Sequence, residues 1–250
     1  MTADIERWRG RVALVSGASA GIGASVARAL SQSGLKVAIG ARRIEPLEAL
    51  VKERGDASVW AHPLDVQSAD SVDAFYAALL SHWGTVDVLV NNAGVGFRGD
   101  LWTQPVEQWA SMLDVNVLGL LRMMQPALQQ MMANGRGHIF NVSSMAGHRV
   151  PPRTSVYSAT KYAVGALTEG LRKDLRSVKS PVRVTAISPG FVNTEFIDAY
   201  IGNADEAKSI REGYPLLTGA DVASAVVYAL GAPDHMQVHD VLIRPTDQPN

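Results

Sequence analysis

The sequence Val12-Ala-Leu-Val-Ser-Gly-Ala-Ser-Ala-Gly-Ile-Gly23 decides the fold of this chain. Its first five residues fit a short buried strand, and three glycines follow closely. Apolar side chains at helical spacing begin directly afterwards, from Ala24 to Leu30. A strand, a glycine turn and a helix in this order are typical of the first unit of an α/β domain.

The same alternation of short apolar runs and amphipathic stretches continues to the end of the chain. Each run precedes a cluster of Gly, Asn, Asp or Ser, and runs that are nearly all apolar are typical of parallel strands covered on both faces. We therefore expect an α/β fold, with residues 1–250 forming one Rossmann-type domain around a seven-stranded, doubly wound parallel sheet. The predicted strands are Val12 to Ser16, Lys36 to Gly40, Ser58 to His62, Val86 to Asn91, His138 to Ser143, Val182 to Ser188 and Val238 to Ile243.

Composition excludes several classes of function. The 250 residues include 23 basic and 24 acidic side chains, so no large uniform field attracts nucleic acid or an anionic membrane. There is no cysteine, which excludes disulfides, thiolate metal sites and cysteine nucleophiles. Met1 to Gly10 is polar where a signal peptide would be apolar, and no apolar run is long enough to span a membrane. We expect a cytoplasmic protein with neither a nucleic acid nor a membrane as partner.

Two longer segments have less regular patterns. Phe191 to Leu217 is rich in Asn, Asp, Glu and Gly but contains several large apolar residues, and we interpret it as a mobile lid. Pro105 to Ala133 is predicted to be one long helix. Its four methionines, at 123, 124, 131 and 132, are interpreted as core or subunit-contact residues rather than a sulphur site.

The glycine loop is the first candidate binding element. Gly17, Gly21 and Gly23 let the backbone approach a dinucleotide pyrophosphate at the positive end of the following helix. Taken alone, such a loop is equally a tight strand-to-helix connection. The spacing Gly-x3-Gly-x-Gly also differs from the common Gly-x-Gly-x2-Gly fingerprint.

The residues after the second predicted strand indicate which dinucleotide binds. About 20 residues after the loop, where NAD-binding proteins carry a carboxylate for the ribose hydroxyls, this chain has Arg42 and Arg43, and no acidic residue precedes Glu45. Planar guanidinium groups match the oxygens of a ribose 2′-phosphate, which favours NADP(H). The alternative is a solvated arginine pair at a helix start.

Further cofactor candidates follow later strands, where an open α/β sheet has its ligand crevice. Asp65 suits a hydrogen bond from the adenine amino group, or else caps the next helix in competition with Ser68. Asn91-Asn92-Ala93-Gly94 permits close approach of backbone to a ligand, although a plain turn explains it nearly as well.

A second constellation points to proton transfer. Tyr157 and Lys161 lie four residues apart in an amphipathic segment, on one face of a helix, and Ser143-Ser144 ends the fifth predicted strand. A nearby ammonium and a cationic nicotinamide favour the phenolate of a tyrosine whose ordinary pKa is about 10. By itself the pair also fits a half-buried tyrosine beside a solvated lysine.

Together these motifs resemble the short-chain dehydrogenases/reductases over essentially the whole chain. The glycine loop, Asn-Asn-Ala-Gly, Ser144, Tyr-x3-Lys and Ser188-Pro189-Gly190 occur in that family's order. The segments from Glu6, Ser144, Tyr157 and Ile243 resemble one subgroup, the member 11 type of dehydrogenase/reductase and related bacterial carbonyl reductases. The resemblance implies the strand order 3-2-1-4-5-6-7 and a homodimer or homotetramer, because the long helices of this family commonly pair between subunits.

The resemblance also implies a role for each matching residue. Tyr157 gives the proton to the carbonyl oxygen, Ser144 orients that oxygen, and Lys161 binds the nicotinamide ribose and lowers the tyrosine pKa. Asn116 matches a fourth catalytic position, where a helix distortion holds a water. Contacts with NADP(H) are expected from Gly17, Ser19, Ala20, Gly21, Ile22, Gly23, Arg42, Arg43, Asp65, Val66, Asn92, Ala93, Gly94, Tyr157, Lys161, Pro189, Gly190, Val192 and Thr194.

The expected substrate pocket is mostly apolar. Ser144 and Tyr157 meet the reacting group, and Phe97, Met145 and Phe196 line the pocket, which favours a hydrophobic ketone, aldehyde or alcohol such as a steroid or terpenoid. A sugar or acyl-carrier substrate would require more basic anchors than Arg98 and Arg149. His148 and Arg149 either touch substrate or pack the loop.

No metal site is predicted, because no pair of the six histidines has ligand spacing with carboxylates nearby. Two other functions stay open. One is an imine reductase or a dehydratase on the same fold. The other is a non-catalytic NADPH sensor, against which the intact Ser144, Tyr157 and Lys161 speak.

Overall fold

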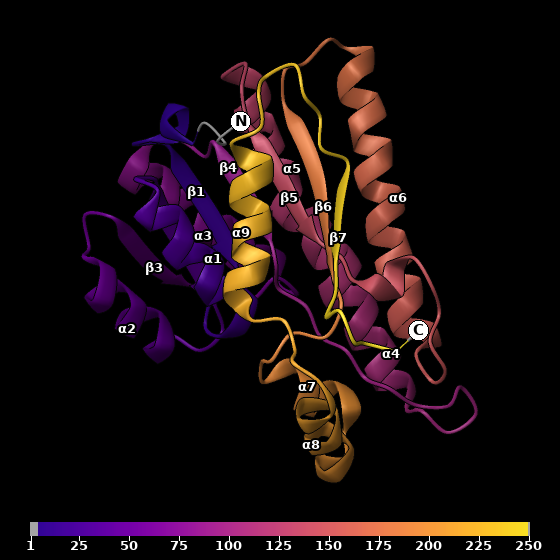
Figure 1. The fold of residues 1–250 in the computed structure, drawn as a ribbon. Helices are drawn as coiled ribbons and strands as arrows, with labels where there is room; N and C mark the ends of the chain where they lie inside the picture. The colour runs from indigo at the N-terminus through magenta and orange to yellow at the C-terminus, as the bar shows by residue number, and fades with distance from the viewer. Residues whose placement is uncertain (1–4, 250) are drawn as a thin grey trace.

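The computed structural model describes residues 5–249 and contains one seven-stranded parallel sheet (Figure 1). Residues 1–4, part of the segment expected to lack a signal peptide, and residue 250 lie outside the described part. The strands are β1 Val12–Ser16, β2 Lys36–Ala41, β3 Val59–Pro63, β4 Val88–Asn91, β5 His138–Val142, β6 Arg183–Pro189 and β7 Asp240–Ile243. Their order, β3-β2-β1-β4-β5-β6-β7, confirms the predicted fold. β4 and β7 begin two residues later than predicted.

Alternate residues of each strand supply two hydrophobic cores, one on each face of the sheet. In β1, Ala13 and Val15 belong to one core, while Val12 and Leu14 belong to the other. The first core is covered by α1 Gly21–Gln32, α2 Glu45–Arg54 and α9 Gly219–Leu230 (Figure 1). The second is covered by α3 Ala69–Trp83, α5 Leu120–Ala133 and α6 Ser155–Ser177. Both faces of the sheet are therefore shielded from water, which explains why polar and apolar residues do not alternate along the strands.

The predicted helix from Pro105 to Ala133 is interrupted. α4 Val106–Leu113 leads into a π-helical segment, Asp114–Gly119, and α5 continues from it. Three of its methionines, Met123, Met124 and Met131, are buried in the core, while Met132 is 45% exposed. The structure thus agrees with a packing role for the buried three. Sequence periodicity did not predict the π-helical segment, because a single extra residue per turn barely disturbs an apolar pattern. The family resemblance did imply a helix distortion at Asn116, and the π-helical segment contains that residue.

The segment predicted as a lid contains two helices, α7 Phe196–Ile201 and α8 Ala204–Gly213. They project together beyond one end of the sheet (Figure 1). An aromatic and aliphatic cluster that includes Ile197, Tyr200 and Ala207 packs them against the rest of the molecule. Their position over the carboxyl ends of the strands fits a cover for a binding site. The mobility of the segment stays a prediction.

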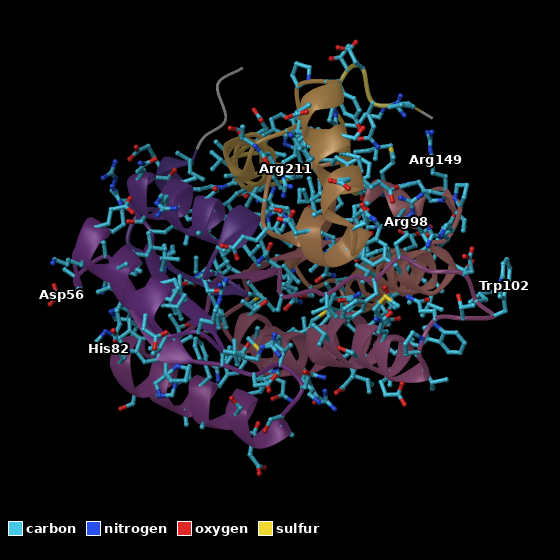
Figure 2. All side chains as sticks on the ribbon, turned by 90° about the horizontal axis from the view of Figure 1, so that it is seen from below. Asp56, His82, Arg98, Trp102, Arg149 and Arg211 are labelled. Atoms are coloured by element: carbon cyan, nitrogen blue, oxygen red, sulfur yellow. The ribbon has the colours of Figure 1, made fainter. Side chains whose placement is uncertain are left out.

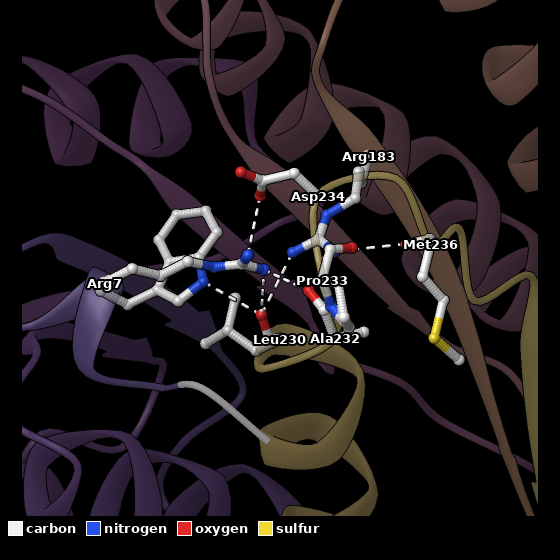
Figure 3. A network of polar contacts seen from close by, with 8 residues as sticks. Arg7, Arg183, Leu230, Ala232, Pro233, Asp234 and Met236 are labelled. Carbon is white, nitrogen blue, oxygen red and sulfur yellow. Dashed lines mark hydrogen bonds and ion pairs between the residues drawn. The ribbon is translucent and has the colours of Figure 1, made fainter. Parts of the chain in front are cut away.

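The amino-terminal segment is tied to the far end of α9. Arg7 Nη2, Trp8 Nε1 and Arg183 Nη2 all donate to the carbonyl oxygen of Leu230, at 3.1, 3.0 and 3.1 Å (Figure 3). Arg183 and Arg7 also reach the carbonyl of Ala232. α9 has no basic residue in its last turn, so these guanidinium groups satisfy its terminal carbonyls from outside.

No helix among residues 5–249 is both long enough and apolar enough to cross a bilayer.

Candidate active site

Two elements, β5 and α6, bring the side chains of Ser144, Tyr157 and Lys161 together. Ser144 follows β5, and Tyr157 and Lys161 stand one turn apart on α6. Tyr157 is 7% exposed and Lys161 6% exposed. The side chains of Ser144 and Tyr157 share a hydrogen bond, and Lys161 Nζ lies 5.8 Å from the centre of the tyrosine ring. The spacing argument from sequence therefore placed all three residues in one constellation.

Burial controls the charge state of this constellation. Loss of hydration raises the pKa of Tyr157 to about 12, and the Ser144 hydrogen bond offsets only part of that increase. Burial also lowers the pKa of Lys161 to about 8. In the chain by itself Tyr157 is therefore a neutral phenol at pH 7, which suits a proton donor. The expected lowering of the tyrosine pKa by Lys161 and a cationic nicotinamide stays a prediction for the cofactor complex.

Lys161 and Asn116 are held by backbone atoms of neighbouring segments. Lys161 Nζ donates to the carbonyl of Val142 at 2.9 Å. Asn116 lies in the π-helical segment and is 2% exposed. Its amide donates to Val95 O at 2.8 Å and accepts from Val95 N at 2.9 Å, and it also donates to Thr160 Oγ1 at 3.1 Å. The side chain of Asn116 thus joins the π-helical segment to α6 and to the loop after β4.

The glycine loop is shaped by the loop after β4. Gly17 has a φ of +67°, and a Cβ there would lie 2.8 Å from Ala93 Cα, so only glycine fits. Asn92 Nδ2 donates to the carbonyls of Ser16 and Gly17, both at 3.0 Å. Ser16 Oγ in turn accepts from the backbone of Asn92 and Ala93, both at 3.1 Å. Asn92, predicted as a cofactor contact, therefore directs its amide to the loop backbone.

The start of α1 is open to an anion. Its N-cap residue, Ala20, provides no side-chain cap, and no acidic residue occupies the first turn. The backbone N–H groups of that turn are thus available to a pyrophosphate, which fits the predicted dinucleotide.

The next segments define the region expected to hold the adenosine. Arg42 and Arg43 follow β2 and are exposed. Arg43 Nη2 donates to Ser19 Oγ at 3.3 Å and pairs with Glu195 at 3.1 Å. Ser68 caps α3, accepting from Ser71 N at 3.2 Å. That removes the alternative role of Asp65 as the helix cap and leaves its carboxylate at the cavity wall, where it accepts from Gln67 N at 3.0 Å.

One cavity of about 1060 Å³ runs from the glycine loop to the catalytic side chains. Almost all of the predicted cofactor residues line it, and so do the predicted substrate residues. Of the predicted site residues, Gly23 and Asn116 do not line it. The shared wall includes Gly17, Ser19, Ala20, Gly21, Ile22, Arg42, Arg43, Asp65, Val66, Asn92, Ala93, Gly94, Phe97, Ser144, Met145, Tyr157, Lys161, Pro189, Gly190, Val192, Thr194 and Phe196.

Aromatic rings surround the reacting end of this cavity. The ring of Tyr157 lies 6.0 Å from that of Phe196 and 5.0 Å from that of Tyr200, centre to centre. Phe196 and Tyr200 stack on each other at 5.6 Å. α7 therefore places two aromatic side chains beside the proposed proton donor. The sequence predicted both as lid residues that line the substrate pocket, but not their contact with Tyr157.

The basic side chains near the mouth are engaged with the protein. Arg98 pairs with Glu206 of α8, and its backbone N–H donates to Tyr200 O at 3.0 Å. Seen from the end that carries α7 and α8, Arg98 lies beside these helices and Arg149 lies farther out (Figure 2). His148 pairs with Asp240 at 2.9 Å and does not line the cavity, which supports loop packing.

Sequence reasoning missed Gln248, which lines the cavity and is 4% exposed. A glutamine in a terminal segment without periodicity gives no signal of burial.

Among residues 5–249, no group of three His, Asp or Glu side chains is arranged to hold a metal ion.

Comparison with known proteins agrees with the resemblance carried by the sequence motifs. Residues 11–203 match the family model of the short chain dehydrogenases. The chain is 43% identical to dehydrogenase/reductase SDR family member 11 of Bos taurus, covering 98% of this chain and 99% of that protein. It is 38% identical to farnesol dehydrogenase of Aedes aegypti over the same shares.

Solved structures show the same similarity in three dimensions. The closed form of serine dehydrogenase complexed with NADP+ matches with a TM-score of 0.91 and 35% identity, covering 96% of each chain. A short-chain dehydrogenase/reductase from Burkholderia phymatum in complex with NAD matches with a TM-score of 0.85 and 29% identity, over 94% of this chain and 89% of that one. Similar proteins thus bind either nicotinamide dinucleotide.

Proposed function

Because this chain belongs to the short-chain dehydrogenase/reductase family and is an oxidoreductase acting on alcohol or carbonyl groups, we propose that it uses NADP(H) to interconvert a hydrophobic ketone or aldehyde and its alcohol. One observation carries the proposal. The buried Ser144–Tyr157–Lys161 constellation opens into the same cavity as the glycine loop and Arg42–Arg43.

The chain's residues divide the chemistry between them. The phenol of Tyr157 gives its proton to the carbonyl oxygen, and the hydroxyl of Ser144 hydrogen-bonds that oxygen as negative charge builds on it. The ammonium of Lys161 binds the ribose and stabilises the phenolate that the proton transfer leaves behind. When bound, NADPH supplies the hydride to the carbonyl carbon. Alcohol oxidation reverses each transfer, with the phenolate of Tyr157 taking the hydroxyl proton. The family resemblance implies that a water at the π-helical segment of Asn116 would re-protonate Tyr157 after carbonyl reduction and carry the proton away after alcohol oxidation.

The phosphate preference rests on charge. Arg42, Arg43 and the hydroxyl of Ser19 gather at the mouth of the cavity, and planar guanidinium groups bind a 2′-phosphate far better than a hydroxyl. The NADP+ complex of the similar serine dehydrogenase supports this choice.

The substrate class rests on the cavity wall. Phe97, Met145, Phe196 and Tyr200 make the reacting end apolar, and Arg98 is neutralised by Glu206. A relative named farnesol dehydrogenase supports a terpenoid or similar lipid-like substrate.

A cytoplasmic location stays a prediction.

The test is oxidation of NADPH, with NADH in parallel, against ketones, aldehydes, quinones, ketosteroids, terpenoid aldehydes and imines. We expect turnover of one hydrophobic carbonyl class with NADPH preferred. Turnover of imines alone would point to the imine reductase, and tight NADPH binding without turnover of any compound would point to the sensor.

The variant Tyr157→Phe tests the mechanism. It keeps the ring but removes the proton, so turnover should fall by roughly 10²–10⁴-fold, the range that general acid–base catalysis contributes. NADPH affinity, measured by quenching of protein fluorescence, should stay within about threefold. Retained activity in this variant would refute the assignment.

A further inference from the structure

The segment after β7 carries a buried glutamine. Gln248 is 4% exposed, while its neighbours Asp247 and Pro249 are exposed. Glutamine is mostly found on protein surfaces, and when buried it requires hydrogen-bond partners. The partners of Gln248 therefore show what the segment does.

Both ends of the Gln248 amide contact the wall of the active site. Oε1 accepts from the backbone N–H of Phe191 at 3.0 Å, and Nε2 donates to the Sδ atom of Met145 at 3.6 Å. Phe191 follows the Pro189-Gly190 turn at the end of β6, and Met145 follows Ser144. One side chain thus connects the two loops between which a carbonyl substrate would have to lie.

The segment is itself fastened to these loops. Arg244 Nη2 donates to the carbonyl of Gln248 at 3.0 Å, and the N–H of Gly190 donates to the carbonyl of Ile243 at 2.7 Å. A Cβ at Gly190 would lie 2.4 Å from Gln248 Oε1. A Cβ there would also lie 2.9 Å from Arg244 Cβ, so the absence of a side chain at Gly190 lets the turn pack closely against this segment.

The sulphur of Met145 accepts from two donors, Gln248 Nε2 and Arg244 Nη1, the latter at 3.9 Å. A thioether is a weak acceptor on a flexible side chain, so its position depends on such contacts. With both donors present, Met145 has a defined conformation at the cavity wall beside Ser144.

We infer that Gln248 is a positioning residue of the substrate pocket, whose amide holds Met145 and the Phe191 backbone in the arrangement that selects the carbonyl substrate. This inference rests on the proposed function, because it concerns the substrate end of the same site.

Steady-state kinetics with the best carbonyl compound of the panel test it. Gln248→Ala should raise the KM for that compound at least tenfold and change kcat and the KM for NADPH less than threefold, because Tyr157 and the glycine loop are untouched. Asp247→Ala, at the exposed neighbouring position, is the matched control and should behave as the wild type. An unchanged substrate KM in Gln248→Ala would overturn the inference.

A double-mutant cycle separates positioning from general loosening of the fold. Met145→Leu keeps the volume but removes the sulphur acceptor. If Gln248 acts through Met145, the double variant should raise the substrate KM no more than the larger single effect, whereas multiplicative effects would contradict coupling.

A readout without turnover keeps the inference testable if the proposed function fails. In the NADPH complex of protein labelled at its eight methionine methyl groups, the signal that Met145→Leu removes identifies Met145. Gln248→Ala should shift that signal and Asp247→Ala should not. An unmoved Met145 signal in Gln248→Ala overturns the inference even when no carbonyl compound is reduced.

Discussion

At the scale of single residues, Lys161 carries a charge at a position where water is nearly absent. The side chain is 6% exposed, and its only hydrogen bond described in residues 5–249 is to the carbonyl of Val142. Folding therefore disfavours the charged form and lowers the pKa from 10.5 to about 8. Function explains why a lysine is kept at this costly position.

The cost should be visible as a pH dependence of stability. Between pH 8 and 10.5 the unfolded chain keeps the Lys161 proton that the folded chain has lost, so the free energy of unfolding rises with pH. Urea unfolding from pH 7 to pH 10 should show wild type gaining up to about 3 kcal/mol relative to Lys161→Met. The raised pKa of Tyr157 acts only above pH 10, with the opposite sign.

Lys173→Met, at an exposed position on the same helix, is the control for the loss of a lysine. A constant difference between wild type and Lys161→Met across this range would show that Lys161 is not desolvated in the folded protein.

The arginine pair gives a second prediction at this scale. Arg42→Ala and Arg43→Ala should each raise the KM for NADPH about 10- to 100-fold more than the KM for NADH, since a charge-assisted hydrogen bond contributes roughly 1.5–3 kcal/mol. Lys52→Ala, exposed on α2 and away from the cavity, serves as the control. Equal losses for both cofactors would assign these arginines to something other than the 2′-phosphate.

At the scale of elements, the amino-terminal segment stabilises α9 from outside (Figure 3). Arg7→Ala should lower the free energy of unfolding by about 2 kcal/mol and Trp8→Phe by about 1 kcal/mol, because the first removes charged donors and the second a neutral one. Urea unfolding followed by circular dichroism measures both, and activity should not change. Arg9→Ala, which removes an exposed ion pair, is the control. If Arg7→Ala and Trp8→Phe lower the free energy of unfolding no more than Arg9→Ala does, the amino-terminal segment does not stabilise α9.

The elements also show where sequence reasoning succeeds. Strands β1, β2 and β6 were predicted to within a residue, because apolar runs bounded by glycine and polar residues have few other structures open to them. α7 and α8 were missed, because both are short and one is mostly polar. The π-helical segment at Asp114–Gly119 depends on tertiary contacts of Asn116 that no local pattern encodes.

At the scale of the whole molecule, large apolar side chains remain on the surface of the long helices. Leu113, Leu118 and Tyr162 are 49%, 48% and 44% exposed, at the end of α4, in the π-helical segment and on α6. The resemblance to the family implied that these helices pair between subunits. We accordingly predict a homodimer or homotetramer that buries them.

Light scattering after gel filtration tests this prediction. Wild type should run as a dimer or tetramer, and Leu118→Lys should shift it to a smaller species, because burying an unpaired ammonium costs several kcal/mol. Leu101→Lys, which changes an equally exposed leucine in the loop before α4, is the control and should leave the mass unchanged. A wild-type monomer would place the exposed leucines outside any interface.

The site residues that could be predicted from sequence lie at the ends of strands or one turn apart on a single helix. Ser144, Tyr157 and Lys161 were found because chemistry and spacing coincide, and Arg42–Arg43 because their position has a known use. Gln248 and the nearness of Tyr200 to Tyr157 come from packing between distant segments. Single-sequence reasoning has no access to such packing.

The buried thioether of Met145 also bears on chemical ageing. Peroxides convert methionine to its sulphoxide according to exposure, so Met132 at 45% and Met236 at 38% should be attacked before Met145 at 8%. Without a cysteine in the chain, stored protein has no thiol to oxidise. The first oxidative damage would thus fall on methionines outside the cavity wall, and partly oxidised protein would keep an intact pocket.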